Sequence, residues 1–259
     1  ERDEEIARKM PYSEMATLGW VPPTKKILEK VFNLRSYFEV ARLELLEQLC
    51  VPGIAYRTMG SNATSDYALA AWAQKARIEA RKISTKPIDI RRLEEILPEV
   101  RKLSIKDPEV FCPELCTLFA ECGIGLVFLP HIRGSFLQGA TFYDGNRIVM
   151  GLTVRGKYAD KFWFSLFHEI YHILAGHISN PCGASEEEER QADNFARDKL
   201  IAPEVYDRFI SQNDFSREAI VKFAKEIKIA PGIVLGRLQK ENYVPYDWYN
   251  DLRIKYRIK

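Results

Sequence analysis

The strongest constraint on how this chain folds is its longest plainly apolar stretch, at residues 162–176. His168, Glu169 and His172 interrupt it. These charged or polar groups exclude a membrane span, and the apolar periodicity predicts a buried helix over about residues 158–176. Ionisable side chains on a buried helix are costly unless they have a partner. A bound metal ion is the simplest partner for all three.

The three interruptions belong to one pentad, because residues 168–172 read HEIYH, a HExxH pattern. Residues four apart on a helix differ by about 40° in direction, so both imidazoles project from one face and can hold one metal ion. Glu169 directly follows the first histidine, where its carboxylate reaches a water molecule at the metal without binding the metal itself. The pentad therefore predicts His168 and His172 as metal ligands and Glu169 as a catalytic base.

A second helix, predicted over residues 185–201, supplies two more candidates. Glu189 and Asp193 form an ExxxD pattern that begins seventeen residues after His172 and places both acids on one helix face. In this arrangement Glu189 supplies the third zinc ligand, and Asp193 accepts a hydrogen bond from a ligating imidazole and fixes its tautomer. The acids at 186–188 are interpreted as a helix start that the helix dipole favours.

His177 follows the pentad but misses a known three-histidine spacing by one residue. The extended pattern HExxHxxGxxH requires glycine at 175 and histidine at 178, where this chain has Ala175 and Ile178. We interpret His177 as a helix-end histidine favoured by the C-terminal dipole. A second-sphere or substrate-facing role is the alternative.

Other histidine and cysteine residues do not complete a second site. His131 follows a proline in a predicted loop, and we expect it to be structural or exposed. Cys112 and Cys116 lie four apart in a helical pattern, but nothing nearby completes a metal site, so we interpret them as helix packing. The five cysteines are an odd and scattered number, which predicts reduced thiols in a cytoplasmic protein.

The composition narrows the class of protein. Lys and Arg number 38 against 36 Asp and Glu, which leaves a formal net charge of +2, and this balance excludes a protein whose main task is to coat nucleic acid. Hydrophobic residues make up 46% of the chain, so wholesale disorder is excluded. The sequence begins with Glu1 rather than methionine and opens with no signal peptide, so we expect a fragment or a processed product.

The remaining patterns predict an α+β fold. We expect residues 1–104 to form a helical N-terminal region and residues 105–259 to form a second domain with a small sheet and several helices. The predicted strands cover 125–129, 136–142 and 147–152, with a hairpin-turn signal at Asp144-Gly145. The predicted helices cover 89–103, 108–121, 158–176, 185–201, 216–228 and 231–241.

Several stretches of the chain resemble the ImmA/IrrE family of zinc metallopeptidases. Residues 162–172 read FWFSLFHEIYH, and residues 189–196 read ERQADNFA, followed by LIAP at 200–203. They are similar to the HExxH helix of that family and to its second helix, of the form ExxAxxFAxxLLxP. Residues 125–152, which include GAT at 139–141, resemble the strands that precede the motif.

The resemblance extends upstream and has two departures. PYSEMA at 11–16, GW at 19–20 and YALAAW at 67–72 resemble the middle region of larger regulators, in which an XRE or HigA-type helix-turn-helix domain precedes the peptidase. That DNA-binding domain is not present in this sequence. Tyr171 stands where the family usually has glycine, which places a bulky phenol beside the metal face.

The resemblance implies a zincin-like metallopeptidase core and an endopeptidase that cleaves a transcriptional repressor. Such an enzyme would serve a stress, prophage or toxin–antitoxin type of regulatory switch. A substrate peptide would lie extended along an edge strand at 147–152. The zinc ligands would be His168, His172 and Glu189, and the candidates for the group that stabilises the oxyanion are Tyr143, Tyr171 and His177.

A DNA-binding regulator or antitoxin is the alternative from another class of protein. It would use the same fold as a sensor or partner-binding module and turn over slowly or not at all. Residues 223–238 scan like a helix-turn-helix, although paired helices packing on the peptidase core explain the same pattern. Intact Glu169 favours the enzyme, since a purely structural metal site does not need that carboxylate. Hydrolysis of a small amide is a third alternative. The basic face of the DNA-reading alternative would comprise Arg237, Lys240, Arg253, Lys255, Arg257 and Lys259.

Overall fold

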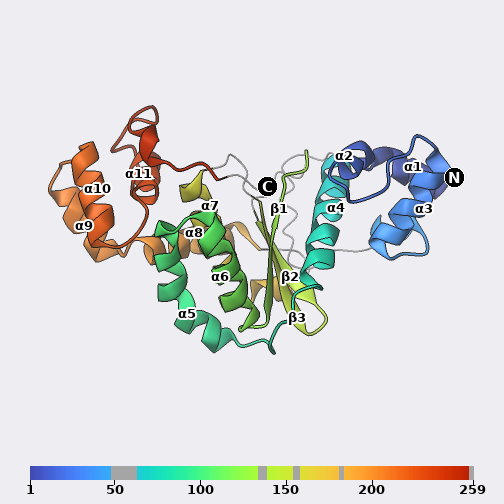
Figure 1. Ribbon diagram of the computed structural model, residues 1–259, viewed down its shortest axis with the longest axis horizontal. Coiled ribbons are helices and arrows are strands. Elements are labelled where there is room, and N and C mark those ends of the chain that lie inside the picture. The colour runs from blue at the N-terminus through green and yellow to red at the C-terminus, as the bar shows by residue number, and fades with distance from the viewer. Residues whose placement is uncertain (48–62, 134–138, 154–157, 181–183, 257–259) are drawn as a thin grey trace.

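The chain forms a mostly helical α+β fold around a small three-stranded sheet (Figure 1), which confirms the α+β part of the prediction. A computed structural model describes residues 1–47, 63–133, 139–153, 158–180 and 184–256. The strands are β1 (Ile124–Leu129), β2 (Gly139–Asp144) and β3 (Arg147–Thr153). None of the helices in these ranges is both long and apolar enough to cross a membrane.

The sheet contains one predicted hairpin and one pairing that the sequence did not indicate. β2 and β3 are antiparallel and are joined by a two-residue loop that begins at Gly145. Gly145 has a φ of +62°, a left-handed conformation that glycine adopts without a Cβ clash. β1 pairs with the other side of β3 in parallel. The predicted strand 136–142 corresponds to β2, and its residues 136–138 lie outside the described part of the chain.

The prediction that residues 147–152 form an edge strand is wrong. The strand order is β1-β3-β2, so the backbone N–H and C=O groups of β3 are used on both sides. Among the strands in the described ranges, only β1 and β2 lie at the edges. The error arose because a hairpin is a local signal, whereas the parallel pairing of β1 with β3 depends on a long crossover that periodicity does not reveal.

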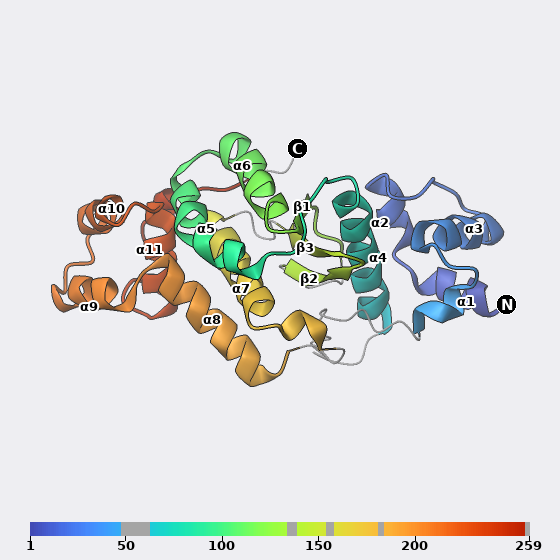
Figure 2. The same ribbon diagram turned by 90° about the horizontal axis from the view of Figure 1, so that it is seen from below.

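Helices cover both faces of the sheet (Figures 1 and 2). α4 packs on one face, and α6 and α7 pack on the other. Along β3 the side chains alternate between the two cores, since Ile148 and Met150 face the α7 side and Val149 faces the α4 side. The N-terminal part consists of α1 (Arg2–Lys9), α2 (Tyr12–Thr17), α3 (Ile27–Phe38), the 3-10 helix η1 (Leu43–Glu47) and α4 (Ala63–Ala80).

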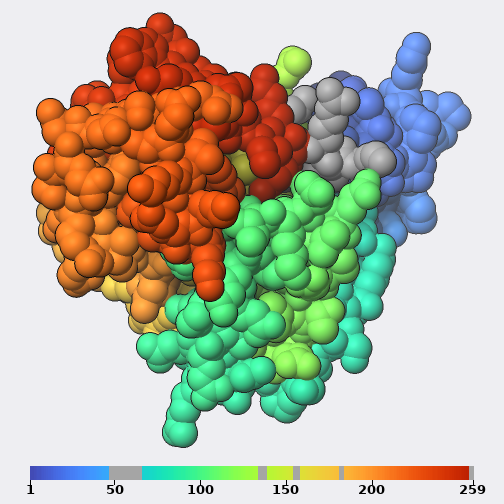
Figure 3. All heavy atoms as spheres, turned by 60° about the vertical axis from the view of Figure 1, so that its left-hand side comes forward, coloured from blue at the N-terminus to red at the C-terminus, as the bar shows by residue number. Residues whose placement is uncertain are grey.

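The helices after α4 share the core on the α7 side of the sheet. α5 follows the prediction for 89–103 and packs against α6 and α7. The helices after α4 are α5 (Ile90–Lys102), η2 (Leu103–Ile105), α6 (Pro108–Ala120), α7 (Ala159–Leu174), η3 (His177–Ser179), α8 (Glu186–Leu200), α9 (Pro203–Ser211), α10 (Arg217–Glu226), α11 (Pro231–Lys240) and η4 (Asn250–Leu252). Figure 3 shows α9–α11 as a mass at one end of the molecule, with the N-terminal helices at the opposite end.

The C-terminal helices are core elements. Most of α11 is buried, and it packs against α7. Arg237 donates a hydrogen bond to the carbonyl of Ile201 at 3.0 Å, so this guanidinium is used inside the molecule. A helix that reads DNA must instead present its side chains to a groove. The arrangement therefore agrees with the packing explanation of the pattern at 223–238.

The segment that follows α11 contacts and stabilises the start of α7. The N–H of Ala159 donates to the carbonyl of Ile254 at 2.8 Å, and Arg253 forms a partly buried ion pair of 2.7 Å with Asp160. Arg253 is thus a structural residue of this junction. Of the other residues of the predicted basic face, Arg257 and Lys259 lie outside the described ranges.

Candidate metal centre

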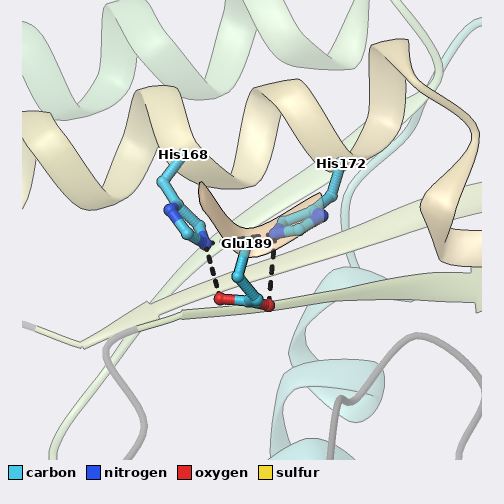
Figure 4. Close-up of side chains that lie close together, drawn as sticks. All are labelled: His168, His172 and Glu189. Atoms are coloured by element: carbon cyan, nitrogen blue, oxygen red, sulfur yellow. Dashed lines mark hydrogen bonds and ion pairs between the residues drawn. The ribbon is translucent and has the colours of Figure 1, made fainter. Parts of the chain in front are cut away.

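The helices α7 and α8 bring the three predicted metal ligands together (Figure 4). His168 Nε2 and His172 Nε2 lie 3.1 Å apart. Glu189 places one carboxylate oxygen 3.4 Å from the first nitrogen and the other 3.6 Å from the second. The ligand atoms of this group all lie within 4.8 Å of one another, so the group can hold a metal ion.

The separations suit a small metal ion. Two nitrogen or oxygen ligands about 2.0–2.1 Å from an ion, at the tetrahedral angle, lie about 3.3 Å apart. The two histidine nitrogens are 3.1 Å apart, close to this value, while the 3.4 and 3.6 Å contacts of Glu189 involve its two different oxygens. A site with three protein ligands and one open position would be of the catalytic rather than the structural kind.

Helix α7 carries both histidines and is buried along most of its length. The predicted segment 158–176 forms the helix Ala159–Leu174, with Phe162, Trp163 and Ile170 in the core. His168 and His172 lie one turn apart beside β2, with 15% and 11% of their side chains exposed. Their polar groups are therefore largely removed from water, and each needs a partner in the protein or a ligand.

Helix α8 packs on α7 and carries Glu189 to the histidines. Its start is set by a capping box, in which the side chain of Ser185 accepts from the Glu188 N–H while the Glu188 carboxylate accepts from the Ser185 N–H. Acidic residues fill the first turn of the helix, where the helix dipole favours negative charge. The cap and the dipole together place Glu189 within the first turn, beside the imidazoles.

Asp193 lies where the sequence predicted, against the ring of the first ligand. Its Oδ1 lies 2.9 Å from His168 Nδ1. A carboxylate only accepts, so Nδ1 carries a proton, and loss of the Nε2 proton on metal binding would leave the Nε2 lone pair facing the metal position. Burial alone would lower the pKa of His168, but the hydrogen bonds to Asp193 and Glu189 outweigh it and raise the pKa to about 9.

His177 contacts the second ligand, which corresponds to the alternative role considered for it. Its Nδ1 lies 3.1 Å from His172 Nδ1, and its Nε2 lies 3.5 Å from Glu188 Oε1. Burial, together with the charge of His168, lowers the pKa of His172 to about 4. The ring of His172 is therefore neutral near pH 7, as a metal ligand must be.

The carboxylate of Glu169 contacts β2. Its Oε2 accepts a hydrogen bond of 2.6 Å from the hydroxyl of Thr141. Burial raises the pKa of the Glu169 carboxyl, while the charge of His168 and the hydrogen bond from Thr141 oppose the rise. A carboxylate with a raised pKa beside a metal site is suited to accept and return a proton.

Two residues of β2 that the sequence analysis did not name as site residues shape the position of Glu169. Thr141 is buried and holds the carboxylate, and a Cβ at Gly139 would lie 2.8 Å from Glu169 Oε1. Both residues lie on the face of β2 that looks toward α7, because alternate strand residues share a face. The sequence signal that could have found them is a threonine within a predicted strand of mostly apolar residues. Strand alternation then places Gly139 on the same face as Thr141.

The two tyrosine candidates make no hydrogen bond to the ligand group. The hydroxyl of Tyr171 donates to Gln191 Oε1 at 3.0 Å, and its ring packs against Phe195. Tyr143 is 43% exposed and lies two residues beyond Thr141 on the same face of β2. The role of either residue in stabilising an oxyanion stays a prediction.

The remaining histidine and cysteines lie apart from the ligand group. Cys112 and Cys116 pack from α6 against the core, and burial raises the pKa of the Cys112 thiol to about 11, which disfavours the thiolate form that binds metals. His131 is half-buried in the turn after β1. Cys50 and Cys182 lie outside the described ranges.

No family model matches the chain, and no curated protein matches it.

Proposed function

We propose that this chain is a zinc-dependent endopeptidase with a zincin-like core. The observation that carries the proposal is the joint position of His168, His172 and Glu189, whose ligand atoms lie within 4.8 Å of one another, two histidines and a carboxylate being a ligand set that zinc uses. Glu169 lies next to this group without belonging to it. A purely structural site has no use for such a carboxylate. The resemblance to the ImmA/IrrE family supports the same function.

Each residue of the site would have its own role in peptide hydrolysis. A bound zinc ion supplies Lewis acidity, which lowers the pKa of water and polarises the scissile carbonyl. Glu169 accepts the proton of the attacking water and returns it to the leaving amine. Thr141 holds the carboxylate by a hydrogen bond from its hydroxyl. Asp193 keeps the lone pair of His168 Nε2 directed at the metal.

The substrate peptide would pair with β2. β2 borders β3 on one side only, among the strands in the described ranges. Its residues Gly139 and Thr141 touch Glu169, so a peptide extended along this edge would bring its backbone next to the general base. The identity of the substrate as a transcriptional repressor rests on the family resemblance alone.

The first experiment measures the metal. Protein purified without chelators or a histidine tag is analysed by elemental mass spectrometry, and we expect about one zinc per chain in the wild type and little in Glu189→Ala. A folded wild-type protein without metal would overturn the zinc site.

The second experiment measures cleavage. A library of peptides of mixed sequence is incubated with the wild type and with Glu169→Gln, and products are identified by mass spectrometry. We expect Glu169→Gln to retain zinc and to lose cleavage. Equal cleavage by both proteins would contradict the role of Glu169. Cleavage of small amides but of no peptide would favour the alternative substrate class.

A further inference from the structure

The second ligand, His172, is connected through its other ring nitrogen to a pair of residues outside the metal site. His172 Nδ1 lies 3.1 Å from His177 Nδ1. His177 Nε2 in turn lies 3.5 Å from Glu188 Oε1. The side chains of the two histidines are only 11% and 12% exposed, so water does not readily replace the contact between them, whereas Glu188 is 30% exposed and lies at the rim of the group.

When both rings are neutral, two nitrogens at this distance share one proton, which allows two arrangements. In the first, His172 donates from Nδ1, and its Nε2 lone pair faces His168 and Glu189. In the second, His177 donates from Nδ1, and the proton of a neutral His172 sits on Nε2, where it blocks the metal position. The two arrangements of this pair therefore differ in whether His172 can bind a metal.

The carboxylate of Glu188 distinguishes the two arrangements. In the first, the proton of His177 lies on Nε2 and faces a carboxylate oxygen, which is favourable. In the second, the lone pair of Nε2 faces that oxygen, which is unfavourable, because a carboxylate only accepts. The contact with Glu188 thus stabilises the arrangement in which His172 is ready to bind the metal.

We propose that His177 and Glu188 are positioning residues that hold His172 in its metal-binding tautomer. The inference rests on the metal site of the proposed function, but not on peptide cleavage. Glu188 also caps α8 through its other oxygen, which accepts from the Ser185 N–H at 2.6 Å. One side chain therefore links the start of the helix that carries Glu189 to the orientation of His172.

The position of His177 depends on how α7 ends. Five residues along a helix correspond to a rotation of about 140° from the starting face, so a continued helix would carry His177 away from His172. Instead α7 ends at Leu174, and Gly176 adopts a φ of +74°. The chain turns there and returns His177 to the side of His172.

The test compares the zinc affinity of four proteins by competition with a chromophoric zinc chelator at a fixed pH. Removal of an outer partner of a ligating histidine typically weakens metal binding about 10–100-fold, and we expect a loss in this range for His177→Ala. Glu188→Gln should show a smaller loss in the same direction, because glutamine preserves the capping box but removes the charge. Glu187→Gln is the matched control, since Glu187 lies on the same first turn but contacts Arg190 and Gln191 instead.

Two further measurements separate a positioning role from a structural one. His177→Gln should recover part of the affinity lost in His177→Ala, because its amide oxygen can accept from His172 Nδ1. Histidine side-chain ¹H–¹⁵N NMR of the zinc-loaded wild type should place protons on His172 Nδ1 and His177 Nε2. Circular dichroism of the metal-free variants checks that each one folds.

The outcomes distinguish this inference from the proposed function. Wild-type affinity in both His177→Ala and Glu188→Gln, or a proton on His177 Nδ1 in the loaded protein, would overturn the inference alone. A wild-type protein that takes up no zinc would overturn both. Zinc binding with the expected losses, but without any peptide cleavage, would support the inference and contradict only the peptidase function.

Discussion

The hydroxyl of Thr141 on β2 donates a hydrogen bond of 2.6 Å to the carboxylate of Glu169 on α7. This bond joins the edge strand of the sheet to the residue that we propose as the general base. A base must be held within hydrogen-bond reach of the proton that it takes. On the proposed function, β2 would have two roles, since the strand that holds Glu169 would also offer its edge to a substrate peptide.

Replacing Thr141 by valine should reduce peptidase activity most at low pH. The side chains have similar size, but valine cannot donate, and the hydrogen bond from Thr141 is one of the influences that lower the pKa of Glu169. The pKa of Glu169 should therefore rise, and the acid limb of the pH profile of kcat/KM should move to higher pH. A hydrogen bond to a charged group contributes about 1.5–3 kcal/mol, so we expect a loss of about tenfold or more near neutral pH. Thr141→Ser should restore the wild-type profile, and an unshifted acid limb in Thr141→Val would contradict the prediction.

Adding one carbon at Gly139 should displace Glu169 while leaving the metal in place. A Cβ at this position would lie 2.8 Å from Glu169 Oε1, and the flexible end of the glutamate would give way. A displacement of about 1 Å in a catalytic group can cost about 100-fold in rate, so kcat of Gly139→Ala should fall by about that factor with zinc content unchanged. Gly151→Ala is the control, because its Cβ meets Trp72 on the other face of the sheet. It should lower stability without a specific loss of kcat, and equal kcat losses in the two variants would contradict the prediction.

The turn at Gly176 should matter for zinc affinity as well as for stability. Alanine at this left-handed position is strained by about 1 kcal/mol, and a Cβ there meets no atom within 4 Å, so the cost is conformational. If relief of the strain moves His177 away from His172, zinc binding should weaken.

Gly145 provides a matched control for that experiment. Its φ is +62°, and its Cβ would also meet nothing within 4 Å, but it lies in the β2–β3 hairpin. We expect Gly145→Ala and Gly176→Ala to show similar losses of stability in denaturant unfolding, and only Gly176→Ala to show weaker zinc binding by chelator competition. Equal zinc affinity in both variants would contradict the prediction.

A buried carboxylate in the N-terminal region should make stability depend on acid pH. Asp3 accepts hydrogen bonds from the Leu43 N–H at 2.9 Å and from Arg35 Nε at 2.7 Å. Burial alone would raise the pKa of Asp3, but these partners outweigh it and lower the pKa below its usual value. The ionised form is therefore favoured by folding. This stabilisation is present above the pKa of the unfolded chain, about 3.9, and is lost as the pH falls through the lower pKa of the folded chain.

Asp3→Asn should lower the free energy of unfolding by about 1–2 kcal/mol at pH 7, and the difference from the wild type should shrink as the pH falls below about 3.9. Denaturant unfolding at a series of pH values measures both effects. Glu5→Gln is the control, since Glu5 is an exposed member of an ion pair with Arg2 on the same helix and should change stability little. A pH-independent difference for Asp3→Asn would contradict the prediction.

The sequence by itself determined the parts of the candidate site that depend on helix periodicity. Two histidines four residues apart must share a face once the segment is helical, and the apolar character of residues 158–176 made it so. Glu189 and Asp193 follow the same rule on α8. The structure places Glu189 against both rings and Asp193 against His168, and their roles at a metal stay predictions.

Only the tertiary structure decided the relationships between elements that are distant or irregular. Strand order made β3 central rather than an edge, and the packing of α7 on β2 brought Thr141 to Glu169. The return of His177 to His172 required a helix end at Leu174 and a left-handed Gly176. Periodicity describes which face a residue occupies within one element. It carries no information about which element that face meets, because burial of apolar area, which selects the partner, is non-directional and depends on the whole chain.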